Sequence, residues 1–175
     1  MNIIQSPDRC SYTALYGGGS LFLAGGISGC FNWQEYVCNQ LVEQYKPDRR
    51  VHIFNPRRVG NLAKEGDEAL AQIKWEHDYL DLVSYISFWF PKETACPITL
   101  FELGKYCQIL ESDYGDSWLS CNDDLIIGMD PNYPRRFDVE AQMKLVYGNK
   151  GIAFIYNLDE FIVEIAKKLN LKRKE

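Results

Sequence analysis

The sequence predicts an α/β fold in which a parallel sheet lies between two layers of helices. Short apolar runs alternate with helical patterns along most of the chain, and several runs are apolar throughout, as in strands that are buried on both faces. Right-handed crossovers place the intervening helices on both sides of the sheet. We therefore expect a three-layer sandwich with a five-stranded parallel sheet in the order 2-1-3-4-5.

Each element has its own signal. Asn32 and Glu35 have the spacing of a capping box at a helix start, and Pro47 ends that helix. Pro97 suits the first turn of the helix that follows the third strand. The expected elements, in order, are a strand at 21–24, a helix from 32, a strand at 51–54, a helix at 68–83, a strand at 85–90, a helix from 97, a strand at 125–128, a helix at 139–147, a strand at 151–155 and a helix at 158–169.

The length of 175 residues, with 46% apolar and 25% charged residues, fits a single globular domain with a sizeable core. We expect that domain at residues 21–175. Residues 1–20 form a polar, glycine-ended extension, which adds either an edge strand or a surface loop.

Composition disfavours several classes of protein. The net charge of −5 disfavours a nucleic-acid polymer as the partner, because such proteins need a basic stripe. The most apolar run, residues 82–90, spans about half of a membrane helix, so no membrane association is expected. The N-terminus lacks the basic start and apolar segment of a secretory signal, and the six cysteines have no metal-like spacing. We expect a cytoplasmic protein with reduced thiols, no metal and no cofactor.

A glycine-rich loop follows the first predicted strand, where ligands of open parallel sheets bind. Gly25 and Gly26 allow close approach of a ligand to the backbone, and Ser28 adds a hydroxyl. The loop has neither the Walker pattern nor the GxGxxG spacing. It is either a ligand contact or simply a tight turn.

Glu102 lies early in the predicted helix that begins near Pro97, among apolar neighbours. Partial burial raises the pKa of such a carboxyl group, whereas the helix N-terminus favours the charged form. A charged, poorly hydrated carboxylate beside a crevice is a good nucleophile towards an anomeric carbon. The alternative is an exposed glutamate favoured only by the helix dipole.

Glu76 falls in the middle of a helical stripe with Ala69, Ile73 and Leu80, which we expect to face the core. A buried charge needs a partner or a function. The alternatives are that Glu76 reaches water or pairs with an arginine. His77 beside it is a candidate partner.

Two carboxylates that converge on one crevice suit glycosidic chemistry. Arg57 and Arg58 follow the second strand and are candidates to hold a phosphate, although a surface pair is an equally good interpretation. The aromatic side chains either stack on a base or belong to the core; they are Trp33, Trp75, Trp89 and Tyr133. The two histidines, His52 and His77, form no Ser-His or Cys-His pattern.

Five sequence blocks together resemble the nucleoside 2-deoxyribosyltransferase-like family, from about residue 21 to residue 160. The ELG block at 102–104 is the most specific. The blocks, in order, are FLAGGISG at 22–29, NPRR at 55–58, QIKWE at 72–76, FWFP at 88–91 and ITLFELG at 98–104.

The resemblance implies a flavodoxin-like, Rossmann-like fold and roles for particular residues. Glu102 would be the nucleophile that attacks C1′ and holds a covalent deoxyribosyl intermediate until a second base or water takes the sugar. Glu76, where better-studied members have Asp, would assist proton transfer or orient the sugar. Gly25, Gly26 and Ser28 would line the sugar or a 5′-phosphate.

Better-studied transferases carry an Asp shortly before the ELG block, and here Thr99 would take over part of its role. The implied partners are a small nucleoside or nucleotide and a free base. The resemblance also implies a homo-oligomer in which a neighbouring subunit helps to close the site. Three hypotheses remain: a nucleoside transferase or N-glycosidase, a nucleoside 5′-monophosphate N-glycosidase in which Arg57 or Arg58 holds the phosphate, and a nucleotide-binding sensor without turnover.

Overall fold

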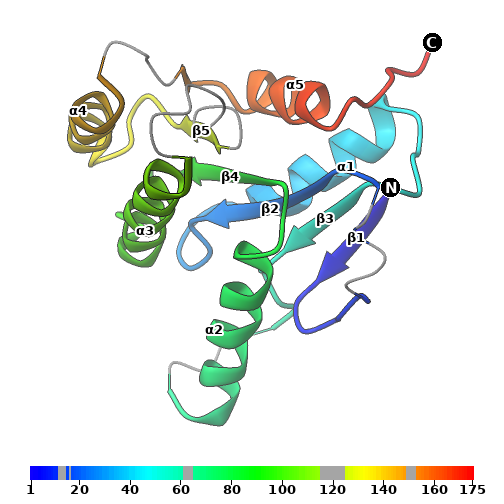
Figure 1. Ribbon diagram of the computed structural model, residues 1–175, viewed down its shortest axis with the longest axis horizontal. Helices are drawn as coiled ribbons and strands as arrows, with labels where there is room; N and C mark the ends of the chain where they lie inside the picture. Colours follow the sequence, from blue (N-terminus) through cyan, green and yellow to red (C-terminus); the bar gives the residue numbers. More distant parts are fainter. Residues whose placement is uncertain (12–14, 16, 61–64, 115–124, 149–152) are drawn as a thin grey trace.

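The fold is a parallel sheet with helices on both faces, as the alternating pattern predicts (Figure 1). The computed structural model describes residues 1–11, 15, 17–60, 65–114, 125–148 and 153–175, and only the backbone of residues 108–114. The described strands are β1 (Asn2–Gln5), β2 (Ser20–Gly25), β3 (His52–Asn55), β4 (Tyr85–Phe90), β5 (Leu125–Met129) and β6 (Phe154–Ile155). The helices are α1 (Trp33–Gln44), α2 (Asp67–Leu80), α3 (Pro97–Tyr114), α4 (Arg136–Tyr147) and α5 (Leu158–Lys168).

The sheet has six strands in the order β1-β3-β2-β4-β5-β6, so the expected number of five was wrong. The additional strand, β1, comes from the N-terminal extension and pairs in parallel with β3, Asn2 lying opposite His52. The other strands have the predicted order 2-1-3-4-5. Of the two outcomes left open for the extension, the structure therefore shows the edge strand.

Side chains alternate along each strand and build a core on either face of the sheet. Leu21 and Leu23 of β2 pack in the layer of α1 and α5. Phe22 and Ala24 point to the opposite face, into the core that the side chains of α2, α3 and α4 share. Both faces of β2 are thus buried, which explains why its sequence is apolar without alternation.

The tryptophans and Tyr133 belong to the core. Trp33, Trp75, Trp89 and Tyr133 are each at most 5% exposed. Their polar atoms are satisfied within the protein where the structure records a contact: Trp33 Nε1 donates to the Gly26 carbonyl, and Tyr133 Oη donates to the Ala95 carbonyl. The core interpretation of these rings is confirmed.

Helix α1 begins as predicted, because the Asn32 side chain accepts a hydrogen bond from the Glu35 amide at 3.2 Å. Helix α4 begins at Arg136, three residues before the expected start. Strand β6 comprises Phe154–Ile155, whereas residues 151 and 152 of the predicted strand lie outside the described residues. Within the described part of the chain, no helix combines the length and the apolarity that crossing a membrane requires.

The buried face of α2 agrees only in part with the predicted one. Gln72, Trp75, Tyr79 and Leu80 are buried. Of these only Leu80 belongs to the predicted stripe, and Ile73 of that stripe is 60% exposed. All four residues of the stripe line a cavity, and Leu80 also packs in the core; they are Ala69, Ile73, Glu76 and Leu80. Helical spacing identifies which side chains share a face, but it does not tell a core from a cavity.

Candidate functional site

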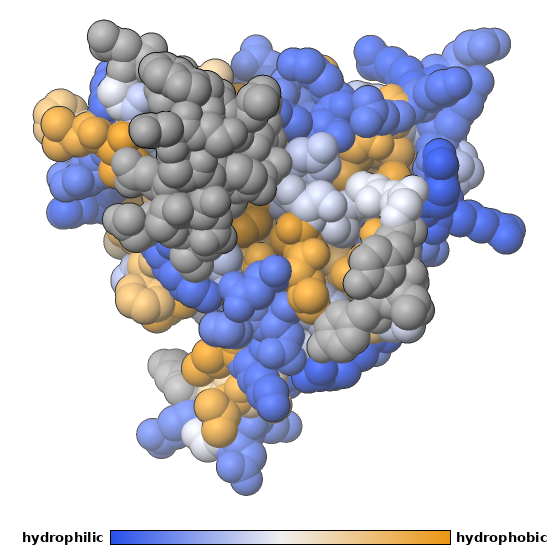
Figure 2. All heavy atoms as spheres, viewed as in Figure 1, coloured by the Kyte–Doolittle hydropathy of each residue, from blue (hydrophilic) through white to orange (hydrophobic). Residues whose placement is uncertain are grey.

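A cavity of about 610 Å³ lies between α2, α3 and the loop after β2. Most of its wall is apolar, and three apolar side chains at its border, Ile73, Ile98 and Phe101, are themselves more than half exposed. Figure 2 shows apolar side chains at the surface of α2, in the lower part of that view. A cavity of this size that combines apolar walls with a few polar groups is typical of small-molecule sites.

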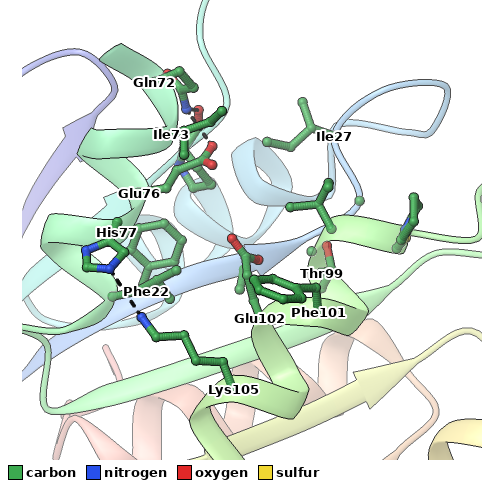
Figure 3. A pocket seen from close by; sticks show the side chains of 18 of the residues that line it. Phe22, Ile27, Gln72, Ile73, Glu76, His77, Thr99, Phe101, Glu102 and Lys105 are labelled. Atoms are coloured by element: carbon green, nitrogen blue, oxygen red, sulfur yellow. Dashed lines mark hydrogen bonds between the residues drawn. The ribbon is translucent and has the colours of Figure 1, made fainter. Parts of the chain in front are cut away.

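Glu102 points into this cavity from the second turn of α3 (Figure 3). Its side chain is half-buried, and among the described residues neither of its carboxylate oxygens has a hydrogen-bond partner. The pKa of Glu102 is raised to about 8, mainly by burial and in addition by the nearby Glu76 carboxylate, while the Lys105 cation acts in the opposite direction. The alternative of a fully exposed helix-start glutamate is excluded.

Glu76 enters the same cavity from α2 (Figure 3). Gln72, one turn earlier, donates a hydrogen bond from Nε2 to Glu76 Oε1 at 2.6 Å. Burial raises the pKa of Glu76, and the bond from Gln72 and the positive charge of Arg58 act in the opposite direction. Both carboxyl groups therefore enter one largely apolar cavity, where a negative charge on Glu76 disfavours ionisation of Glu102.

The sequence suggested His77 as a partner of Glu76, but the structure shows other contacts for this histidine. It contacts Lys105, whose Nζ lies 3.4 Å from His77 Nε2, and Asp81, whose Oδ2 lies 3.4 Å from His77 Nδ1. Lys105 also donates to Asp81 Oδ1 at 3.2 Å, and the Tyr106 hydroxyl donates to the same oxygen. These four polar side chains join the end of α2 to α3 beside the cavity.

The glycine loop forms another wall of the cavity through Gly25, Gly26, Ile27 and Ser28. The backbone of Gly25 has φ +155°, and a Cβ there would collide with the Trp89 carbonyl and the Trp33 ring. The N–H of Gly26 donates to the Trp89 carbonyl, so this amide is not free to bind a ligand. The loop is thus both a tight turn and a wall of the candidate site.

Arg57 and Arg58 do not line the cavity. Arg57 Nε donates to Gln34 Oε1 at 3.0 Å, and one Nη donates to the Gly26 carbonyl at 3.3 Å. Arg57 therefore stabilises the glycine loop without lining the cavity. Arg58 Nε donates to Ser6 Oγ at 3.2 Å. Thr99, by contrast, is buried in the cavity wall one turn before Glu102.

The structure brings together six of the predicted site residues and adds polar groups that sequence reasoning missed, among them Lys105 and Gln72. The six are Gly25, Gly26, Ser28, Glu76, Thr99 and Glu102. Lys105 follows Glu102 by three residues and Gln72 precedes Glu76 by four, so helical spacing offered a signal for both. Within the described residues, no group of His, Cys, Asp and Glu side chains is arranged to hold a metal ion.

Comparison with known proteins identifies one family. A family model described as "Nucleoside 2-deoxyribosyltransferase like" matches residues 18–112, more than half of the chain. The matched region includes β2, the glycine loop, α2 and the part of α3 that carries the carboxylate in the cavity. A search of curated proteins found no match.

Proposed function

The chain belongs to the nucleoside 2-deoxyribosyltransferase-like family, and we propose that it cleaves or transfers the N-glycosidic bond of a nucleoside. The observation that carries this proposal is the carboxylate of Glu102. It is half-buried, lacks a hydrogen-bond partner among the described residues, and points into a cavity that a second carboxylate also enters.

In the proposed first step, a carboxylate oxygen of Glu102 attacks C1′ of the sugar. The C1′–N bond breaks, its electron pair goes to the base, and the base takes a proton from Glu76. The sugar is then an ester of Glu102. This division of labour matches the retaining mode of glycosidic chemistry.

In the second step, a free base or a water molecule attacks C1′ from the side that the first base has left. The acceptor loses a proton to Glu76, and the C1′–O bond to Glu102 breaks. Both carboxyl groups return to their starting states. The active form of the pair therefore carries one proton, with Glu76 protonated and Glu102 charged. The raised pKa values of both groups keep a proton on the pair, and the Lys105 cation favours the charged form of Glu102.

Other cavity residues bind the substrate in this proposal. Thr99 and Ser28 offer hydroxyl groups to the sugar, and Gly25 and Gly26 permit its close approach. Lys105 stabilises the charged form of Glu102.

The charge of the site favours a nucleoside over a nucleotide. Arg57 and Arg58, which the sequence nominated to hold a phosphate, do not line the cavity. Glu76 and Glu102 do, and Lys105 is already bound to Asp81. A phosphate in this cavity would meet two carboxyl groups, and no guanidinium group lines the cavity wall, so charge repulsion weakens its binding.

Incubation of the purified protein with deoxyadenosine and a free pyrimidine, followed by chromatography, tests the proposal. Exchange of the base identifies a transferase, and release of adenine without exchange identifies a hydrolase. Parallel reactions with deoxyadenosine 5′-monophosphate test the preference for uncharged substrates. Binding of nucleosides with no product from any of them would contradict the proposal and favour a sensor.

Glu102→Gln should reduce turnover by roughly 10³-fold or more, because an amide neither attacks C1′ nor forms the ester. Glu68→Gln is the matched control, since Glu68 is exposed in the first turn of α2 and does not line the cavity. Acid quench of the wild-type reaction should add the mass of the sugar to the peptide that contains Glu102. An adduct on another peptide would remove Glu102 from the mechanism.

A further inference from the structure

Gln72 has a buried side-chain amide, and both its nitrogen and its oxygen form hydrogen bonds within the protein. Its Nε2 donates to the Pro56 carbonyl at 2.9 Å and to Glu76 Oε1 at 2.6 Å, and its Oε1 accepts from the Ser6 hydroxyl at 2.6 Å. A flipped amide would place its carbonyl against two acceptors. The surroundings of Gln72 therefore present an N–H donor to Glu76.

Ser6 continues this chain of hydrogen bonds away from the cavity. It is 3% exposed and lies just after β1. Its hydroxyl donates to Gln72 and accepts from Arg58 Nε at 3.2 Å. The donors thus all point in one direction, from a guanidinium group through a hydroxyl and an amide to a carboxylate, and such chains strengthen each bond.

Further contacts attach the same N-terminal segment, residues 6–10, along α2. The Asp8 carbonyl accepts from Trp75 Nε1 at 2.7 Å, and the Cys10 amide donates to Tyr79 Oη at 3.1 Å. Arg9 lies 3.5 Å from Asp78. All of this segment precedes residue 18, where the match to the family model begins.

We infer that Gln72 and Ser6 are positioning residues for Glu76, which makes the N-terminal segment part of the functional site. Gln72 holds one oxygen of Glu76, and among the described residues the other oxygen accepts no hydrogen bond. That oxygen remains for the cavity, which Glu102 also enters. The effect of this arrangement on turnover, though not the arrangement itself, depends on the function proposed above.

The arrangement also sets the charge of Glu76. The charged and titratable groups around it are Arg58 before α2, His77 on α2, and Glu102 and Lys105 on α3. The donor from Gln72 and the charge of Arg58 lower the pKa of Glu76, whereas burial raises it. Without the Gln72 donor, Glu76 should retain its proton to higher pH.

The test compares four variants by two measurements. Gln72→Met removes the donor at similar volume, and Ser6→Ala removes only the hydroxyl. Ser6→Thr restores a hydroxyl, and Arg9→Ala cuts a different contact between the segment and α2. The first measurement is the pH titration of the Glu76 carboxyl group by ¹³C NMR in the ligand-free protein, with Glu76→Gln to assign the signal. The second is kcat and KM with deoxyadenosine.

We expect the Glu76 titration to move to higher pH in Gln72→Met and, less strongly, in Ser6→Ala. We expect kcat to fall about tenfold in Gln72→Met and about threefold in Ser6→Ala, with little change in KM, because Glu76 loses the hydrogen bond that orients it even though it holds its proton to higher pH. Ser6→Thr and Arg9→Ala should behave as wild type. If Gln72→Met fails to fold, comparison of Ser6→Ala with Ser6→Thr still tests whether the hydrogen-bond chain positions Glu76.

An unmoved Glu76 titration in a folded Gln72→Met or Ser6→Ala variant would overturn the inference, whatever the turnover. An Arg9→Ala variant that reproduces Ser6→Ala would also overturn it, because the segment would then act only by packing on α2. If the titration moves but the wild-type protein processes no nucleoside, the positioning role stands and the proposed function fails.

Discussion

Two glutamates lie at the centre of the candidate site, and each is held by different means. Glu76 has a hydrogen-bond donor in Gln72, whereas Glu102 has a nearby cation in Lys105 and no hydrogen bond among the described residues. Because both carboxyl groups are half-buried, a negative charge on Glu76 raises the pKa of Glu102. We treat them as one titrating pair.

The pH dependence of kcat/KM should be bell-shaped, with its alkaline limb near pH 8. The pKa of Glu102 is raised to about 8, so above that pH the pair has lost the proton that the leaving base needs. In Glu76→Gln the opposing charge is absent, so the pKa of Glu102 should fall and turnover should drop by about 10²-fold. A limb that stays near pH 8 in Glu76→Gln would show that another group sets it.

Glu102→Gln should stabilise the protein at alkaline pH. A carboxyl group with a raised pKa in the folded state destabilises the fold once it is charged, so stability is lost as pH rises from its ordinary value of 4.5 to about 8. Allowing for partial exposure, the gain in unfolding free energy above pH 8 is roughly 3 kcal/mol, and it should vanish at pH 4. Urea unfolding at both pH values checks this, and Glu68→Gln should show no such gain.

At the scale of elements, the site depends on how α2 and α3 are held together. Lys105 and Tyr106 of α3 contact Asp81, just after α2, and Lys105 also contacts His77. The same lysine lies one turn after Glu102. The polar contacts thus position the two helices and supply the positive charge that offsets burial of the nucleophile.

Lys105→Met should raise the pKa of Glu102, move the alkaline limb of kcat/KM above pH 8 and reduce turnover about tenfold, because the cation that favours the charged form is lost. Lys144→Met on α4 is the control, since Lys144 is exposed and does not line the cavity. An unchanged pH profile of kcat/KM in Lys105→Met would show that Lys105 does not affect the pKa of Glu102.

At the scale of the whole molecule, the N-terminal extension is continuous with the sheet. Strand β1 pairs with β3, and Ile4 packs in the same core as Phe54 and Trp75. Ile3, which precedes Ile4 in β1, is 40% exposed. The extension therefore buries apolar surface in the core from which α2 and α3 also gain stability.

Ile4→Ala should reduce the free energy of unfolding by roughly 2–3 kcal/mol, and Ile3→Ala by less than about 1 kcal/mol. The difference follows from burial, because only Ile4 leaves a cavity when it is truncated. Chemical denaturation of both variants is the measurement. Equal, small effects would mean that the extension does not unfold together with the rest of the domain.

The sequence by itself determined the alternation of strands and helices, the order of five strands and the loops that meet at one edge of the sheet. These follow from local signals, such as the capping pattern at Asn32 and the apolar run of β2. It also nominated Glu102 and Glu76, since a carboxylate among apolar neighbours is costly unless it is used.

Only the tertiary structure decided what surrounds those carboxylates. The stripe through Ile73 and Glu76 faces a cavity rather than the core, Arg57 turns behind the glycine loop, and Ser6 reaches Gln72. Residues 66 positions apart in the chain meet in that last contact. Periodicity records which side chains share a face of an element, but packing between elements determines what that face meets, and no local pattern contains it.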